Sequence, residues 1–205
     1  MADKKKKRGK AAWGSILYIV ICAVFGGMIG VMLAENDVEL DLTQILLIMV
    51  FFMLAVLLHL ILHEAGHMFA GFLSGYRFLS FRIGSFMWEK QKDGNIRFSK
   101  YSLAGTGGQC LMCPPEYNNG NFPFVLYNLG GVIMNFLLAA LAAAIALLVP
   151  VGPWMKVFLW MMVFVGVLTG LVNGIPFKSK TVNNDGSNTL TIGKSPASRR
   201  AFWLQ

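Results

Sequence analysis

Charged residues are scarce in this chain of 205 residues. Asp, Glu, Lys and Arg together make up 14% of the sequence, whereas 56% of it is hydrophobic. Soluble domains contain about 25% charged residues, so the composition excludes an ordinary soluble globular protein. Cysteine is also too rare for a disulfide framework, because Cys22 lies inside an apolar run and only Cys110 and Cys113 could pair. We interpret this single C-x-x-C as unspecialised thiols, because a structural zinc site needs a second pair.

All but one of the basic residues, Lys156, lie in three clusters. The chain has 18 Lys and Arg against 10 Asp and Glu, a net charge of +8. In a soluble protein this excess would suggest a nucleic-acid partner. Here the clusters at 4–10, 77–100 and 178–200 are separated by long apolar runs. This distribution is typical of the cytoplasmic loops of a membrane protein, and we predict no nucleic-acid partner.

Four apolar runs are long enough to cross a bilayer, whose hydrocarbon core of about 30 Å requires roughly 20 residues of helix. They predict an α-helical polytopic membrane protein with spans at 13–33, 45–73, 123–149 and 154–176, the last broken at 173–176. The first run is too long for a signal peptide.

The loops between these spans differ in charge. Residues 34–44 contain acidic residues and no basic one, whereas residues 74–122 are rich in Lys and Arg. Because Lys and Arg collect on the cytoplasmic side, we expect a multi-pass protein of the cell membrane whose terminal segments, 1–12 and 177–205, are both cytoplasmic.

The basic loop 74–122 predicts a membrane-associated β-hairpin on the cytoplasmic side, followed by a Gly- and Pro-rich loop. Apolar residues alternate over 79–88, and a change of phase at Gly84 and Ser85 indicates a bulge. Residues 92–95 then supply a turn, and 96–103 return as the second strand. Near the end of the chain, Ser195 begins a short amphipathic helical pattern. We expect it to lie on the membrane surface or to begin a further domain.

The sequence His63-Glu64-Ala65-Gly66-His67 lies near the cytoplasmic end of the second predicted span. In this H-E-x-x-H pattern, two imidazoles one turn apart can share a zinc ion, while Glu64 points about 100° away and can act as a general base. Ionisable residues at membrane depth are costly and usually mark a functional site. A buried polar cluster that joins helices by hydrogen bonds is the alternative.

A catalytic zinc site needs a third protein ligand and one open position. The candidates on the same side of the membrane are Cys110, Cys113, Glu116 and Asp185. Asp185 is favoured because Asn173 and Pro176 break the last helix, and Gly186 allows a turn that directs the carboxylate inward. An ordinary surface turn is the alternative. His59, one turn before His63, could be a ligand, but we expect it to support the site or simply to be buried.

Three motifs resemble those of the site-2 protease family of intramembrane zinc metalloproteases, in its bacterial branch, and the resemblance extends from residue 45 to about 190. They are HEAGH at 63–67; Gly131 to Asn135, similar to the Gly-x-x-x-Asn helix signature; and Asn173, Pro176, Asp185 and Gly186, similar to the Asn-x-x-Pro and Asp-Gly motif. The chain departs from the family at Val132, where many members have Pro, and in the longer gap between Pro176 and Asp185.

The resemblance implies a role for each matching residue. His63, His67 and Asp185 would bind zinc, Glu64 would be the general base, and Asn135 or Asn173 would contact the oxyanion or the substrate backbone. The core would be three helices with the site toward the cytoplasm. The hairpin would receive the unwound substrate, although one that only covers the site fits the sequence equally well.

We therefore predict an intramembrane zinc metalloprotease. Its partners would be the lipid bilayer and a membrane protein or signal or pro-peptide with a transmembrane segment, cleaved in or near that segment. One alternative is an inactive zinc-binding membrane chaperone or trap, which would not need Glu64. The other is a metal or proton transporter, which would need polar residues in the outer halves of the spans, and these are nearly all apolar.

Overall fold

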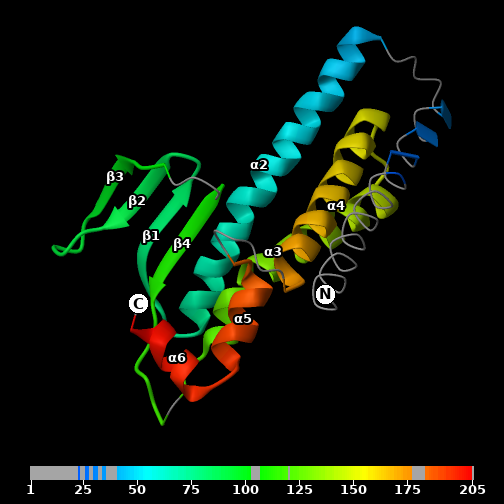
Figure 1. Ribbon diagram of the computed structural model, residues 1–205. Coiled ribbons are helices and arrows are strands. Elements are labelled where there is room, and N and C mark those ends of the chain that lie inside the picture. Colours follow the sequence, from blue (N-terminus) through cyan, green and yellow to red (C-terminus); the bar gives the residue numbers. More distant parts are fainter. Residues whose placement is uncertain are drawn as a thin grey trace, which may run out of the picture.

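The computed structural model describes residues 23, 26–27, 30–31, 34–35, 41–102, 107–119, 121–176 and 183–204. Its elements are helices α2 (Leu42–Leu73), α3 (Phe124–Leu148), α4 (Pro153–Gly174), α5 (Asp185–Gly193) and α6 (Pro196–Trp203), and strands β1 (Arg77–Ile83), β2 (Phe86–Lys90), β3 (Ile96–Lys100) and β4 (Gly108–Cys113). Figure 1 shows three long helices side by side, with the sheet next to one half of α2 and with α5 and α6 at the same end of the bundle.

Three of the predicted spans are helices in the structure. Among the described residues, α2, α3 and α4 are long and apolar enough to cross a membrane. The predicted span 13–33 lies mostly outside the described residues, and its described positions are helical. The sides on which the loops and the termini lie stay a prediction.

Helix α2 begins three residues before the predicted span because of a capping box. The amide of Gln44 donates to Asp41 Oδ1 over 2.8 Å, and the amide of Asp41 donates to Gln44 Oε1 over 3.0 Å. These two bonds satisfy amides that otherwise lack partners at a helix start. Most of the N-terminal half of α2 exposes large apolar side chains such as Met49 and Met53, which suits contact with lipid.

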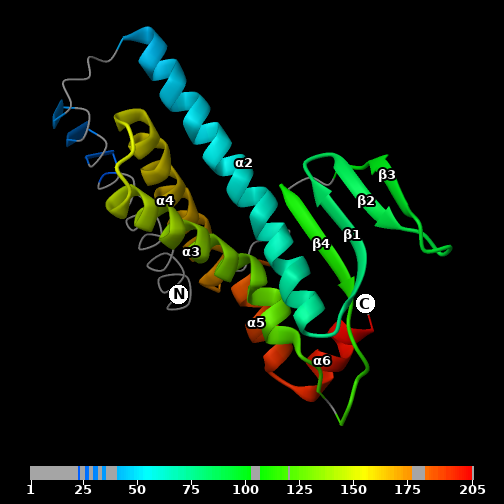
Figure 2. The ribbon, with the colours of Figure 1, turned by 180° about the vertical axis from the view of Figure 1, so that it is seen from behind.

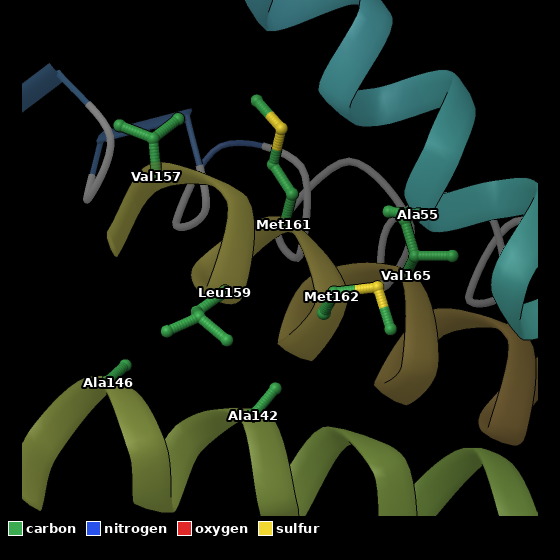
Figure 3. Close-up of a cluster of buried hydrophobic side chains, with 8 residues drawn as sticks. All are labelled: Ala55, Ala142, Ala146, Val157, Leu159, Met161, Met162 and Val165. Carbon is green, nitrogen blue, oxygen red and sulfur yellow. The ribbon is translucent and has the colours of Figure 1, made fainter. Parts of the chain in front are cut away.

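Small side chains let the three helices approach closely. One core cluster joins Ala55 of α2 and Ala142 and Ala146 of α3 to the buried face of α4, as Figure 3 shows. Further along, α2 and α3 touch at Gly66 and Gly130, where a Cβ built on Gly66 would lie 2.5 Å from the Gly130 carbonyl oxygen. In lipid the hydrophobic effect does not hold helices together, so close van der Waals packing of this kind stabilises their association instead.

Within the described residues the β structure has four strands, where the sequence predicted a two-stranded hairpin. They form one antiparallel sheet in the order β3-β2-β1-β4, and β1 and β4 pack against α2 (Figure 2). The predicted bulge at Gly84 and Ser85 was wrong: these residues form a two-residue turn between β1 and β2. Ile83 pairs with Phe86, and Gly84 has a φ of +56°, which such a turn accommodates. A register shift occurs instead near Leu79, where β1 pairs with β4.

The helical pattern after Ser195 is confirmed as α6. This helix packs on the segment that follows β4, because Trp203 Nε1 donates to the Pro115 carbonyl over 2.7 Å and the Tyr117 hydroxyl donates to the Pro196 carbonyl over 3.2 Å. The end of the described chain is therefore attached to the same end of the bundle as α5.

Candidate metal centre

The structure brings His63, His67 and Asp185 together. Both histidines are buried on one face of α2, and their Nε2 atoms lie 3.2 Å apart. Asp185 Oδ2 lies 3.2 Å from His63 Nε2 and 3.5 Å from His67 Nε2. One ligand atom from each residue falls within 4.8 Å of the others, so the group could hold a metal ion.

Asp185 reaches the histidines because α5 begins there. The predicted sharp turn at Asp185 and Gly186 is instead the first turn of this helix. Gly186 allows a close approach, since a Cβ at this position would clash with the carbonyl oxygen of Gly174 at the end of α4. The glycine is therefore needed for packing between α4 and α5.

Asn184 fixes the start of α5 and was not predicted as a site residue. Its side chain accepts a hydrogen bond from the Ser187 amide over 3.0 Å. Its Nδ2 donates to the carbonyls of Val172 (2.7 Å) and Ile175 (2.6 Å). It therefore caps α5 and ties it to α4 directly before Asp185. An N-cap residue can be recognised in the sequence, but its bonds to another helix cannot.

The Asp185 carboxylate is buried and ionised. Burial alone would raise its pKa, but contacts with the His63 and His67 rings lower the pKa to about 2. When both rings present Nε2 lone pairs, as metal ligation requires, its Oδ2 atom has no hydrogen-bond donor among the described residues. A buried anionic oxygen without a donor is costly, and a cation between it and the two histidines would compensate for this.

The tautomer of His67 suits metal binding. Its Nδ1 lies 2.8 Å from the backbone carbonyl of Tyr127. A carbonyl only accepts, so Nδ1 carries the proton and Nε2 presents its lone pair to Asp185 and His63. Metal-ligating histidines usually hold their second nitrogen in this way.

Gly131 leaves room at the centre. A Cβ built on this residue of α3 would lie 2.6 Å from the Nε2 atoms of both His63 and His67. The first position of the Gly-x-x-x-Asn signature therefore faces the proposed ligands directly.

The other candidate ligands lie outside the cluster found among the described residues. Cys110 is buried in β4, and burial together with the charge of Glu64 raises the pKa of its thiol to about 12. This thiol is therefore protonated at neutral pH when no metal is bound. Cys113 and Glu116 do not join the cluster either.

Glu64 lies beside β4, which holds its carboxylate. The backbone amide of Cys110 hydrogen-bonds to Glu64. A Cβ on Gly108 would lie 2.8 Å from Glu64 Oε1, so any other residue at this point of the strand would displace the Glu64 side chain. Sequence reasoning did not identify β4 as the strand that positions Glu64.

A cavity of about 640 Å³ connects these groups. It is lined by His63, Glu64, His67 and Asp185 and also by Asn135 and Asn173. The Asn173 amide donates to the Thr169 carbonyl in its own helix over 3.0 Å.

His59 is fully buried and lies outside the ligand cluster. Its ring nitrogens contact the Asn135 side chain and the Met162 carbonyl instead. The expectation that it is not a ligand agrees with this geometry.

Comparisons with known proteins identify the family. The model of peptidase family M50 matches residues 51–184, more than half of the chain, and this segment includes HEAGH and ends one residue before Asp185. Comparisons with curated proteins and with solved structures found no match. The chain therefore belongs to peptidase family M50, the site-2 protease family of zinc metalloproteases.

Proposed function

We propose that this protein is an intramembrane zinc metalloprotease that hydrolyses peptide bonds in or near the transmembrane segments of membrane proteins or of signal or pro-peptides. The observation that carries the proposal is the meeting of His63, His67 and Asp185 beside Glu64, in a cavity bordered by helices that are long and apolar enough to span a membrane.

His63, His67 and Asp185 would hold the zinc ion, because two imidazoles and one carboxylate with an open position match catalytic zinc sites. Zinc supplies Lewis-acid activation of water and of a peptide carbonyl. Glu64 would take the proton from the attacking water and return it to the leaving amine. Its burial and the amide of Cys110 keep the carboxylate in place for both steps.

Strand β4 offers a place for an unwound substrate. It is an edge strand of the sheet, and Gly108, Gln109 and Leu111 line the cavity beside Glu64. A peptide that pairs with β4 would have its backbone held by main-chain hydrogen bonds within reach of the proposed zinc ligands. Asn173, which lines the same cavity, remains a candidate for the oxyanion or the substrate backbone.

Glu64 distinguishes an enzyme from a zinc-binding trap. Glu64→Gln keeps the size and hydrogen-bonding reach of the side chain but removes the base, whereas Asp185→Ala removes a proposed ligand and leaves the base. We expect the purified protein and the Glu64→Gln variant to carry about one zinc ion per chain. Cleavage by Glu64→Gln should fall by at least about 10², the usual contribution of a general base. Asp185→Ala should lose both zinc and cleavage.

The assay uses a single-span membrane substrate in detergent, with mass spectrometry to locate the cut and metal analysis of each variant. Undiminished cleavage by Glu64→Gln would contradict the mechanism. Cuts confined to soluble loops would contradict the intramembrane role, and zinc binding without any cleavage by the unaltered protein would indicate a trap.

A further inference from the structure

A chain of hydrogen-bonding groups leads from α4 to His63 and is not used by the proposed mechanism. His59 Nε2 lies 2.9 Å from the Met162 carbonyl oxygen, and His59 Nδ1 lies 3.1 Å from the side chain of Asn135. Asn135 Nδ2, at the other end of the same amide, lies 3.0 Å from His63 Nδ1. His59 is 0% and Asn135 is 1% exposed, so both side chains are shielded from bulk solvent.

The Met162 carbonyl determines where the His59 proton lies. A carbonyl oxygen only accepts, so His59 Nε2 must donate to it. The two groups that hydrogen-bond to the His59 ring among the described residues, a carbonyl and an amide, are uncharged. A second proton would therefore place an uncompensated positive charge in a fully buried position of a membrane-spanning helix, which is costly. His59 is thus neutral, and its Nδ1 is an acceptor.

An acceptor at His59 Nδ1 in turn determines the orientation of Asn135. The two ends of an amide group occupy nearly the same volume, and the hydrogen-bond network decides which end lies where. The structure places Oδ1 toward His59 and Nδ2 toward His63, and in this orientation His59 would need two protons. With the ends exchanged, Nδ2 donates to His59 Nδ1, and Oδ1 accepts from His63 Nδ1.

We propose that His59 and Asn135 are positioning residues that hold the proton of His63 on Nδ1 and so direct its Nε2 lone pair toward His67 and Asp185. His63 is then in the same tautomer as His67, which the Tyr127 carbonyl holds from α3. The assignment of His63 as a zinc ligand rests on the proposed function. The proton positions follow from the hydrogen-bonding partners and the burial of His59.

This chain of hydrogen bonds from Met162 through His59 and Asn135 to His63, called the relay below, uses both polar ends of Asn135. One end contacts His59 and the other contacts His63. This assigns the last residue of the Gly-x-x-x-Asn signature to orientation of a ligand and leaves Asn173 as the candidate for contact with the substrate.

Zinc affinity tests the relay in the full chain in detergent, by competition with a chromophoric chelator. We expect Asn135→Leu and His59→Leu to weaken zinc binding by about 10- to 100-fold, the usual effect of removing a partner of a ligand. His59→Gln should restore affinity to near that of the unaltered protein, because glutamine offers an amide donor for Met162 and an oxygen acceptor for Asn135.

Asn128→Leu is the matched control for Asn135→Leu. Asn128 is also buried in α3, and its Nδ2 donates to the Phe124 carbonyl of the same helix. We expect its zinc affinity to be unchanged. Equal losses in the Asn128 and Asn135 variants, or unchanged affinity in Asn135→Leu, would overturn the proposal.

Nitrogen-15 NMR of the zinc-loaded protein gives a readout that a purely structural role would not affect. The chain has three histidines, so single substitutions assign every imidazole signal. We expect His59 to carry one proton, on Nε2. A proton on Nδ1, or on both nitrogens, would overturn the proposal. Zinc affinity and the NMR signals are both measured without cleavage. The relay can therefore be disproved while the protease assignment stands, and the protease assignment can be disproved while the relay stands.

Discussion

At the scale of single residues, Gly131 defines the space between the two histidines. A Cβ at this position would lie 2.6 Å from both Nε2 atoms, well inside contact distance. We expect Gly131→Ala to lose most of its zinc, because the methyl group occupies the position toward which the proposed ligands point. Metal analysis of the purified variant measures this directly.

Gly193→Ala is the control for that substitution. Its Cβ would lie 3.6 Å from Phe124, an ordinary contact. This variant should retain about one zinc ion per chain. If Gly131→Ala retained zinc equally well, the proposed ligand set would be wrong.

The sequence predicted the residues of the centre better than their surroundings. The HEAGH motif and the resemblance indicated His63, His67 and Asp185, and the structure brings these three residues together. The contacts of His59 with α3 and α4 could not be predicted, because they depend on how far each helix is shifted along its neighbours. Apolar helices carry little sequence information about that shift.

At the scale of elements, the junction between α4 and α5 sets the position of Asp185, and Asn184 tests it. Asn184→Ala removes the cap of α5 and both bonds to α4. We expect it to lower the free energy of unfolding by about 1–2 kcal/mol and to weaken zinc binding, because Asp185 is no longer held toward the histidines. Thermal unfolding in detergent and chelator competition measure the two effects.

Asn184→Asp separates the two roles of this residue. Aspartate still accepts from Ser187 but cannot donate to Val172 and Ile175, so we expect a loss of affinity with little loss of the helix cap. Zinc affinity in Asn184→Ala equal to that of the unaltered protein would show that the junction does not position the ligand.

The long helices were predictable, and the sheet was predictable only in part. A run of about 20 apolar residues has few structural alternatives in a membrane, so α2, α3 and α4 agree with their predicted spans to within a few residues. At Gly84 and Ser85, a bulge and a two-residue turn both shift the apolar alternation by one residue, and the sequence could not separate them. Strand β4 pairs with β1 across about 30 residues, and its Gly108–Cys113 sequence shows no regular alternation.

At the scale of the whole molecule, α5, which begins at Asp185, and the turn between α3 and α4 lie toward opposite ends of the bundle (Figure 1). We propose that the sheet, α5 and α6 are cytoplasmic and that this turn faces outward, because Lys and Arg cluster in the loop that contains the sheet. In intact cells, a membrane-impermeant thiol reagent should label Gly152→Cys but should label Lys92→Cys only after permeabilisation.

The parent protein, with its own cysteines, is the background control for this labelling. Labelling of Lys92→Cys from outside intact cells would reverse the proposed orientation and would move the site to the outer face.

The hydrogen bonds that join Met162, His59 and Asn135 also affect how the bundle assembles, because these residues come from α4, α2 and α3. Lipid contacts apolar helix faces almost equally well however far one helix slides along another. A slip of one turn, about 5.4 Å, would break every bond in this group and leave polar atoms in hydrocarbon. These few buried polar atoms therefore favour a single axial alignment of the three helices.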